Sequence, residues 1–168
     1  MIGRGNNSNI IYLIDFGLAQ KYRDEQTKVH SAYKSSKEIA GTVRYSSINA
    51  HLGFQLSRRD DLESFVYSFI YLAKGSLPWQ GINEKNKNIP KNERHGLICR
   101  IKTDTKLNVL CKGLSPNFYK MAKYIQSLSF EEEPDYSKIL SFFENDLKNL
   151  NLENDDIFDW HINTNIVF

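Results

Sequence analysis

Residues 60–73 carry the pattern that most limits how this chain can fold. Large apolar residues recur there at helical spacing and point to nearly every side of the helix: Leu62, Phe65, Val66, Phe69, Ile70 and Leu72. A helix that is apolar on all sides has to be surrounded by other parts of the protein. We therefore predict a central, buried helix, which Gly75 ends.

Length and composition are typical of a globular domain or a large piece of one. The chain has 168 residues, of which 40% are hydrophobic and 25% charged, so it can bury a core. The formal net charge of +2 gives no case for a nucleic-acid-binding surface. No apolar run is long enough to span a membrane and no signal peptide is visible, so we expect a cytoplasmic or nuclear protein without membrane contact.

Cysteine and histidine are too scattered to indicate a metal centre. The two cysteines, Cys99 and Cys111, have neither the spacing of zinc ligands nor the pattern of a disulfide framework. We expect both to be reduced thiols.

Most of the remaining chain also has helical character. A short helix is predicted at 47–52 and another at 95–102, and Ser115-Pro116 is a typical helix start. The last long helix is expected from Tyr136 to Leu150, with Ile139, Leu140, Phe143 and Leu147 on its apolar face. Between the helices, 20–40 is predicted to be a long surface segment and the Asn- and Lys-rich stretch 82–93 a solvated loop.

The N-terminal residues are typical of half a β-hairpin. The stretch Gly3–Ser8 is rich in residues that suit a tight turn, and the apolar, β-branched run Ile10–Ile14 predicts a buried strand. Only Met1 and Ile2 precede the turn, so the partner strand would be very short and an edge would stay open.

The predicted strand leads directly into Asp15-Phe16-Gly17. In protein kinases this tripeptide ends a strand, and its carboxylate holds the Mg²⁺ that bridges the phosphates of ATP. Asp-Phe-Gly alone is common by chance. Here Gly41–Tyr45 and Asp60–Ser64 follow at the spacing of a kinase activation segment.

Together these segments resemble the large, C-terminal lobe of a eukaryotic protein kinase, specifically of the casein kinase I family. The motifs that carry the resemblance follow one another in the family's order: Leu13–Ala19, Lys21–Asp24, Gly41–Gly53, Ser57–Ser64, Leu77–Gly81, Leu110–Gly113, Phe130–Glu132, Pro134–Tyr136 and Phe158–Trp160. Most kinases have Ala-Pro-Glu where this chain has Ser47-Ile48-Asn49. The resemblance implies a mainly α fold, a short β-hairpin followed by a bundle of helices. Residues 1–160 would be an incomplete kinase domain and 161–168 a tail.

The resemblance assigns the nucleotide side of the site to residues around the tripeptide. Asp15 would ligate Mg²⁺, with Ile14, Phe16 and Gly17 beside the ATP site; the alternative for Asp15 is a turn cap. Thr42 resembles the activation-segment threonine that supports the catalytic aspartate, and its alternative is a threonine in an ordinary turn.

The substrate side is assigned in the same way. Ser47, Ile48 and Asn49 would form the floor of the groove for the substrate peptide. Arg44 would bind phosphorylated or acidic residues upstream of the target Ser or Thr, because a guanidinium suits phosphate. Arg94 aligns with a second basic residue of this anion site. The alternative for both arginines is a solvated surface position.

Four further positions have simpler interpretations. Asp61 resembles the aspartate that accepts hydrogen bonds from the backbone of the catalytic loop, which is a scaffold role, and Asp60 could cap the helix instead. Trp79 is expected in the core. Gln126 departs from the family, which usually has arginine there.

The implied function is that of a Ser/Thr protein kinase, transferring the γ-phosphate of ATP, with Mg²⁺, to acidic or pre-phosphorylated protein substrates. The family's catalytic base, its ATP-binding lysine and the asparagine for a second Mg²⁺ have no counterpart among the 168 residues. We therefore expect the chain alone to be inactive and to need the N-terminal lobe or another chain to cover its core.

One hypothesis is that Met1 is an internal methionine of a longer reading frame. An alternative function is that of a non-catalytic docking or decoy module derived from a kinase.

Overall fold

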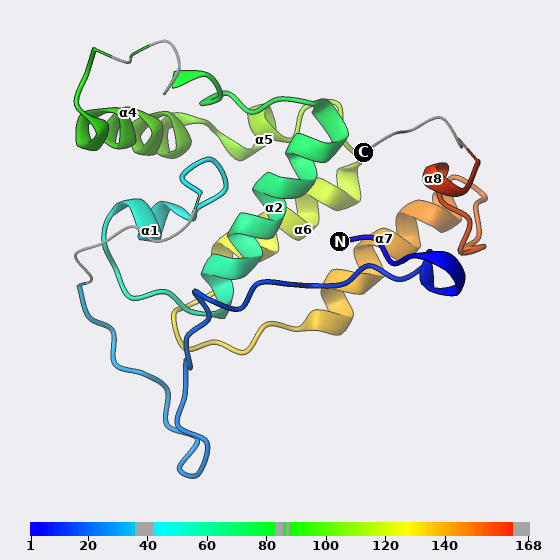
Figure 1. Cartoon of the computed structure of the whole chain (residues 1–168), viewed down its shortest axis with the longest axis horizontal. Coiled ribbons are helices and arrows are strands. Elements are labelled where there is room, and N and C mark those ends of the chain that lie inside the picture. The colour runs from blue at the N-terminus through cyan, green and yellow to red at the C-terminus, as the bar shows by residue number, and fades with distance from the viewer. Residues whose placement is uncertain (36–41, 83–85, 87, 163–168) are drawn as a thin grey trace.

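The computed structural model describes residues 1–35, 42–82, 86 and 88–162. It shows a mainly helical protein in which the long helix α2 lies between the others (Figure 1). The helical elements of the described residues are the 3-10 turn η1 (Gly5–Asn7), α1 (Ile48–His51), α2 (Arg58–Lys74), α4 (Lys91–Asp104), α5 (Leu107–Leu110), α6 (Pro116–Ser127), α7 (Tyr136–Asn149) and α8 (Asp159–Ile162). The mainly α fold predicted from the sequence is confirmed.

Helix α2 is the predicted central helix, and its ends follow from local chemistry. At the N-terminus, the side chain of Asp60 accepts a hydrogen bond from the backbone amide of Ser57 at 2.9 Å. Gly75 ends the helix with a left-handed φ of 72°, a conformation that glycine adopts without strain. Ile70 is completely buried in the middle of the helix.

Helices α6 and α7 form the other half of the core. They lie side by side and run in opposite directions, and α6 also packs on α2 (Figure 1). Ser115 caps α6 by accepting the amide of Phe118 at 2.9 Å, as its sequence predicts. Asn117 donates to the carboxylate of Asp146 on α7 at 2.8 Å, which joins the start of α6 to the end of α7.

Two of the predicted helices differ in detail. Helix α4 begins at Lys91, four residues before the predicted start, because the residues added are solvated and leave no apolar pattern. On α7, Ile139 is buried as predicted, but Leu140 is exposed because α6 covers only one side of the helix.

The core lies between α2 and α6, and buried residues of α4, α5 and α7 pack around it. Its largest fully buried side chain is that of Trp79, which comes from the turn after α2 and packs edge-on against Tyr67. The prediction that Trp79 is a core residue is confirmed. Other members of the core are Val66, Ile70, Ile98, Leu110, Phe118, Met121, Ala122, Ile125 and Ile139.

The N-terminal segment is paired as a hairpin but is not the buried strand that was predicted. Tyr12 donates its amide to the carbonyl of Met1 at 2.8 Å, and Gly3 donates to Ile10 at 2.9 Å. The pairing amounts to one isolated bridge, between Ile2 and Ile11. Leu13 is 83% exposed, because no other described element packs over this part of the segment.

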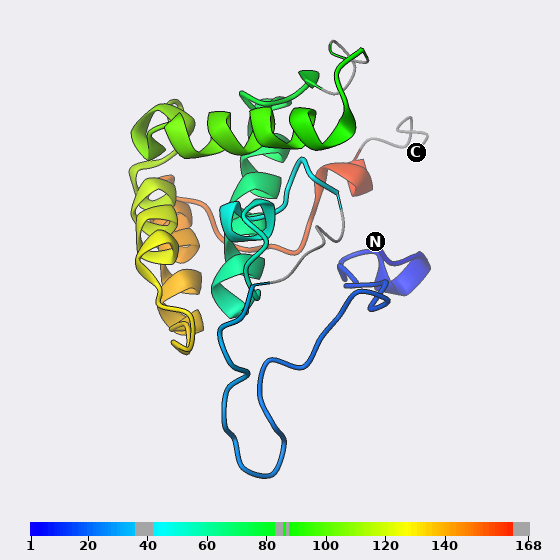
Figure 2. The ribbon, with the colours of Figure 1, turned by 90° about the vertical axis from the view of Figure 1, so that its left-hand side faces the viewer.

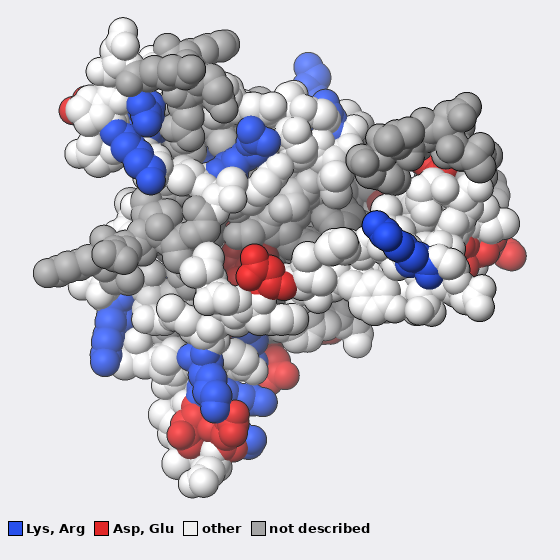
Figure 3. Space-filling model, in the orientation of Figure 1, with Lys and Arg blue, Asp and Glu red and all other residues white. Residues whose placement is uncertain are grey.

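The segment 20–35 projects from the helical body as a long loop (Figure 2). Charged side chains of both signs gather on it (Figure 3), and Lys21 and Glu25 form an exposed ion pair of 2.7 Å. The loop is attached at its base by aromatic contacts, since His30 and Tyr33 both pack edge-on against Phe130, which follows α6. The predicted surface segment is confirmed for its described part; 36–40 lie outside the described residues.

Among the described helices, none combines the length and the apolar character that crossing a membrane would require.

Candidate functional site

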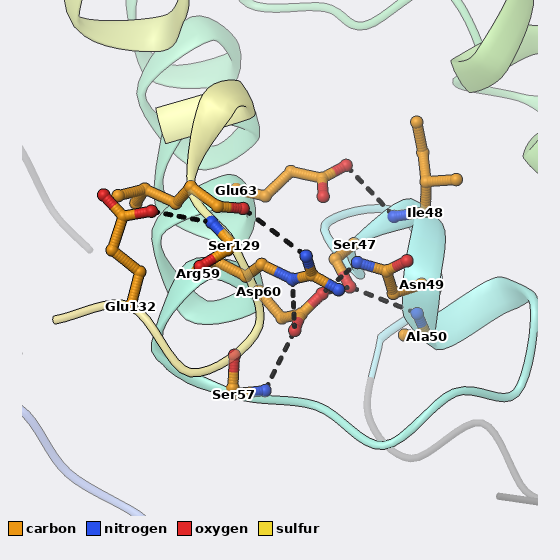
Figure 4. Close-up of polar contacts among 11 residues, drawn as sticks. Ser47, Ile48, Asn49, Ala50, Ser57, Arg59, Asp60, Glu63, Ser129 and Glu132 are labelled. Atoms are coloured by element: carbon orange, nitrogen blue, oxygen red, sulfur yellow. Dashed lines mark hydrogen bonds and ion pairs between the residues drawn. The ribbon is translucent and has the colours of Figure 1, made fainter. Parts of the chain in front are cut away.

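The predicted groove floor is attached to the central helix through the carboxylate of Asp60. Its Oδ1 atom accepts hydrogen bonds from Ser47 Oγ and Asn49 Nδ2, both at 2.9 Å (Figure 4). Ser47 also caps α1 by accepting the amide of Ala50 at 3.1 Å. Asp60 is only 1% exposed, so these bonds form away from water and hold α1 in one orientation.

A second carboxylate of α2 holds the first residue of α1. Glu63 Oε1 accepts the backbone amide of Ile48 at 3.0 Å (Figure 4). It also accepts the hydroxyl of Tyr67 at 2.5 Å. Burial raises the pKa of Glu63, although these two donors act in the opposite direction. The structure thus brings Ser47, Ile48 and Asn49 together, with α2 as their support.

Arg44 lies beside this floor and is half-buried. Its backbone carbonyl accepts a hydrogen bond from the indole nitrogen of Trp79 at 2.7 Å. Its guanidinium carbon is 5.4 Å from the ring centre of Tyr71 and 5.9 Å from that of Tyr45, at cation–π distance. The core therefore fixes the backbone of Arg44, and two aromatic rings guide its side chain.

Lys102 is a feature of this region that the sequence did not indicate. Its side chain, on α4, is 3% exposed, and its ammonium group donates to the carbonyls of Val43 (3.0 Å) and Ser46. The rings of Tyr67 and Trp79 lie 4.8 and 5.1 Å from the ammonium nitrogen. Burial lowers the pKa of Lys102 to about 8, although the nearby Glu63 carboxylate favours the charged form.

Arg94 lies at the start of α4. Its guanidinium donates to the carbonyls of Ile89 at 2.9 Å and Asn86 at 3.4 Å, both in the loop that precedes the helix. These bonds fix the side chain to its own loop. The predicted pairing of Arg94 with Arg44 remains a prediction.

The Asp-Phe-Gly residues lie in an exposed turn. Asp15 has a φ of 64°, which is uncommon outside glycine, and its Oδ1 accepts the amide of Gly17 at 3.3 Å. Phe16 is 66% exposed, and Ile14 is also exposed. The carboxylate of Asp15 therefore caps its own turn and faces solvent, where it can also bind another group.

Thr42 opens the segment that leads to α1. Its carbonyl accepts the hydroxyl of Ser46 and the amide of Tyr45, both at 3.1 Å, which closes a turn. The residue itself is exposed. The proposed support of a catalytic aspartate stays a prediction.

Asp61 lines a cleft of about 440 Å³ between the start of α2 and residues 18–22. Burial, and then the neighbouring charge of Asp60, raise the pKa of Asp61. Aromatic and apolar residues form much of the other wall, among them Leu18, Tyr22, Phe54, Leu56 and Tyr136. The cleft therefore combines a carboxylate with an apolar wall. The acceptance of hydrogen bonds from a catalytic loop stays a prediction for Asp61.

A second cavity, of about 270 Å³, lies between α1, α2, α4 and α6. Glu63 and Lys102 line its interior, and the exposed Gln126 contributes to it from α6. Arg59 and three polar residues also line it, together with apolar residues such as Val66 and Ile125, so the cavity combines one carboxylate, two cations and a hydrophobic wall.

The donors available for a metal are few. The described residues contain no group of three or more His, Cys, Asp or Glu side chains arranged to hold an ion. Asp15 alone still fits Mg²⁺, because this ion is commonly held by one or two carboxylates together with water and substrate phosphates. Asp15 is exposed, and the bond that it accepts from its own turn is long, at 3.3 Å, so its oxygens can serve as ligands.

These features are those of the large lobe of a protein kinase. A helical body surrounds the buried, capped helix α2, Asp-Phe-Gly precedes this helix in the chain, and carboxylates of α2 anchor α1. No protein-family model matches the chain. A relative from Schizosaccharomyces pombe, described as casein kinase I homolog 2, is 44% identical over 162 residues, which is 95% of this chain. This similarity over nearly the whole chain supports a fragment of a casein kinase I family kinase. It spans 36% of the length of this relative.

Proposed function

We propose that this chain is the substrate-binding lobe of a Ser/Thr protein kinase of casein kinase I type. The complete enzyme would transfer the γ-phosphate of ATP to serine or threonine in acidic or pre-phosphorylated proteins. The observation that carries this proposal is the position of Arg44, whose backbone is hydrogen-bonded to the core residue Trp79 next to the floor formed by Ser47–Asn49. A guanidinium held in this way offers a directed donor pair to a phosphate or carboxylate.

The lobe acts mainly by placing the substrate. An extended peptide lying over α1 would present its hydroxyl-bearing residue near the groove floor, while an acidic side chain upstream contacts Arg44. Correct placement can account for a large part of the barrier reduction in phosphoryl transfer, where the protein contributes positioning and charge stabilisation. The hydrogen bonds of Asp60 and Glu63 keep the floor rigid for this purpose.

On the nucleotide side, Asp15 would hold Mg²⁺, and the ion would neutralise charge on the phosphates of bound ATP. Gly17 leaves the Asp15 carboxylate accessible: among the described residues other than its chain neighbours, the atom that an added Cβ would meet within 4 Å is Asp15 Oδ1, at 3.2 Å. A side chain at residue 17 would crowd that oxygen.

A chimera tests the proposal directly. It would join this chain to the N-terminal part of the S. pombe relative and would be assayed on a phosphorylated, acidic peptide. We expect the chimera, and not the 168-residue chain, to transfer phosphate. Arg44→Ala in the chimera should raise KM for the phosphorylated peptide about tenfold with little change in kcat, since it removes a charge-assisted contact. An unchanged KM would contradict the role of Arg44.

A second candidate function is that of a non-catalytic docking module. The observation that favours it is the contrast between the two sides of the site: the groove floor is anchored within the chain, whereas the Asp15 turn is open to solvent. Phosphate transfer by the chimera distinguishes the two, because the isolated chain is expected to bind peptide without nucleotide under either function. A docking module would bind the acidic phosphopeptide in the chimera but would not transfer phosphate to it.

A further inference from the structure

The backbone on both sides of Arg44 is held by side chains from distant parts of the chain. The Lys102 ammonium group binds the carbonyls of Val43 and Ser46, and the Trp79 indole binds the carbonyl of Arg44 itself. Three carbonyls within four consecutive residues are thus satisfied by side-chain donors from α4 and from the turn after α2.

The two donors form one unit. The ammonium nitrogen of Lys102 lies 5.1 Å from the ring centre of Trp79, on which it rests at cation–π distance. Tyr67 provides a second ring at 4.8 Å, and its hydroxyl bonds to Glu63. A change at Lys102 therefore alters the support of Trp79 as well.

Burying an ammonium group is costly unless it is fully hydrogen-bonded. An apolar side chain in the same place would pack well but would leave the carbonyls of Val43 and Ser46 without these donors. The arrangement is accordingly better suited to fixing a backbone than to filling a core. The side chain whose base it fixes is Arg44, because Arg44 lies between the two carbonyls.

We propose that Lys102 and Trp79 are positioning residues that set the preference of Arg44 for phosphorylated or acidic side chains. This inference rests on the proposed function of Arg44. Fixing the Arg44 backbone limits the positions its guanidinium can reach, so the fork is in place for a phosphate before binding. Without Lys102, the chain would still bind peptide over α1 but would discriminate less by charge.

The test measures a ratio of affinities, which a purely structural role would not change. Two acidic peptides, identical except for one phosphoserine upstream of the acceptor serine, are titrated into the 168-residue chain by isothermal calorimetry. We expect wild type to bind the phosphopeptide about tenfold more tightly, the size of one charge-assisted interaction. Lys102→Met should reduce the ratio to about threefold or less, mainly through weaker phosphopeptide binding.

Matched variants separate a positioning role of Lys102 from a general effect of lost positive charge or of misfolding. Arg100→Met removes a positive charge from an exposed position on the same helix and should keep the wild-type ratio. Lys102→Arg keeps a charged donor and should restore part of the preference. Near-UV circular dichroism confirms that each variant is folded. If Lys102→Met does not fold, Trp79→Phe, which removes one donor and keeps a ring, provides the same comparison.

The outcomes also distinguish this inference from the proposed function. If wild type shows no preference and Arg44→Ala changes nothing, the proposed function of Arg44 fails. If wild type prefers the phosphopeptide and Arg44→Ala abolishes that preference, but folded Lys102→Met or Trp79→Phe retains it, the positioning role is overturned.

Discussion

The hydroxyl of Ser47 donates a hydrogen bond of 2.9 Å to the carboxylate of Asp60, and both residues are only 1% exposed. This bond joins the cap of α1 to the first turn of α2. Because Asp60 also accepts the amide of Ser57, one buried carboxylate organises the beginnings of two helices. Its loss would leave several donors unsatisfied at once.

Removing the charge of Asp60 should therefore destabilise the fold, whereas removing the charge of its neighbour Asp61 should not. We expect Asp60→Asn to lower the free energy of unfolding by about 2–4 kcal/mol, since the amide cannot accept all the bonds of the carboxylate. Asp61→Asn is the matched control on the same turn. Burial raises the pKa of Asp61, so removing its charge should be neutral or slightly stabilising. Urea unfolding measures both variants; equal losses would contradict the assigned difference.

The cavity beside Glu63 predicts a stabilising change. Gln126→Arg would place a guanidinium at the cavity lined by Glu63 and would fill part of its 270 Å³. Lys102 and Arg59 line the same cavity and oppose a third cation, so pairing with Glu63 and the added packing together should raise the free energy of unfolding by no more than about 1 kcal/mol. Gln126→Met, which adds packing without charge, is the control. If the two variants have the same stability in thermal unfolding, Glu63 does not pair with residue 126.

His51 predicts a loss of stability in mild acid. Burial, and then the charges of Lys102 and His95, lower the pKa of His51 to about 4. Between about 4 and its ordinary value near 6.5, the unfolded chain binds a proton that the folded chain does not, so stability falls as the pH falls through this range. With allowance for its partial exposure, the loss should be about 1–2 kcal/mol between pH 7 and pH 5.

The variant His51→Phe isolates this effect. The raised pKa values of Glu63 and Asp61 act in the opposite direction, but they are common to both proteins. The difference in unfolding free energy between wild type and variant should therefore shift in favour of the variant as the pH falls. A difference that stays constant from pH 7 to pH 5 would show that His51 does not carry the effect.

The helices could be predicted because their signals are local. Ser115 and Pro116 mark the start of α6, and the spacing of Phe118 and Met121 indicates its buried side, without knowledge of any other part of the chain. The same holds for Gly75 at the end of α2. Of the site, the sequence indicated Arg44 and the groove floor through the family resemblance.

Lys102 could not be predicted in this way. It is followed by Thr103 and Asp104, so the sequence there is typical of a solvated helix end. Its partners are backbone carbonyls more than 50 residues away, and every residue has a carbonyl, so no side-chain pattern marks them. The burial of a charged residue is decided by tertiary contacts alone.

Burial of the run Ile10–Ile14 was predicted wrongly for a related reason. An apolar, β-branched stretch indicates that a strand is suited to burial, but not whether another element covers it. In the described residues nothing covers Leu13, and the strand pairing is limited to its first residues. An apolar pattern therefore does not guarantee burial, because the pattern does not say whether another element covers the strand.

The accessible surface of the chain quantifies this exposure. A compact monomer of 19.5 kDa exposes about 8,500 Å², whereas this chain exposes 12289 Å². Part of the difference is the projecting loop of residues 20–35, and part is the apolar segment from Ile10 to Leu18, which contains seven exposed large hydrophobic residues. Surfaces of this kind associate with one another unless charges prevent it.

We therefore expect the isolated chain to self-associate through this segment, with marginal stability. Leu13→Lys should reduce the association constant at least about tenfold, because a charge on an open apolar edge opposes pairing with a second copy. Stability should change by less than about 0.5 kcal/mol, since Leu13 is almost fully exposed. Val109→Lys makes a comparable change at an exposed apolar residue on α5, outside the two clefts described above, and should leave association unchanged. Sedimentation velocity measures all three proteins. A wild-type chain that sediments as a single monomeric species and melts cooperatively above about 60 °C would contradict the prediction, because that is the behaviour of a domain whose core is already covered.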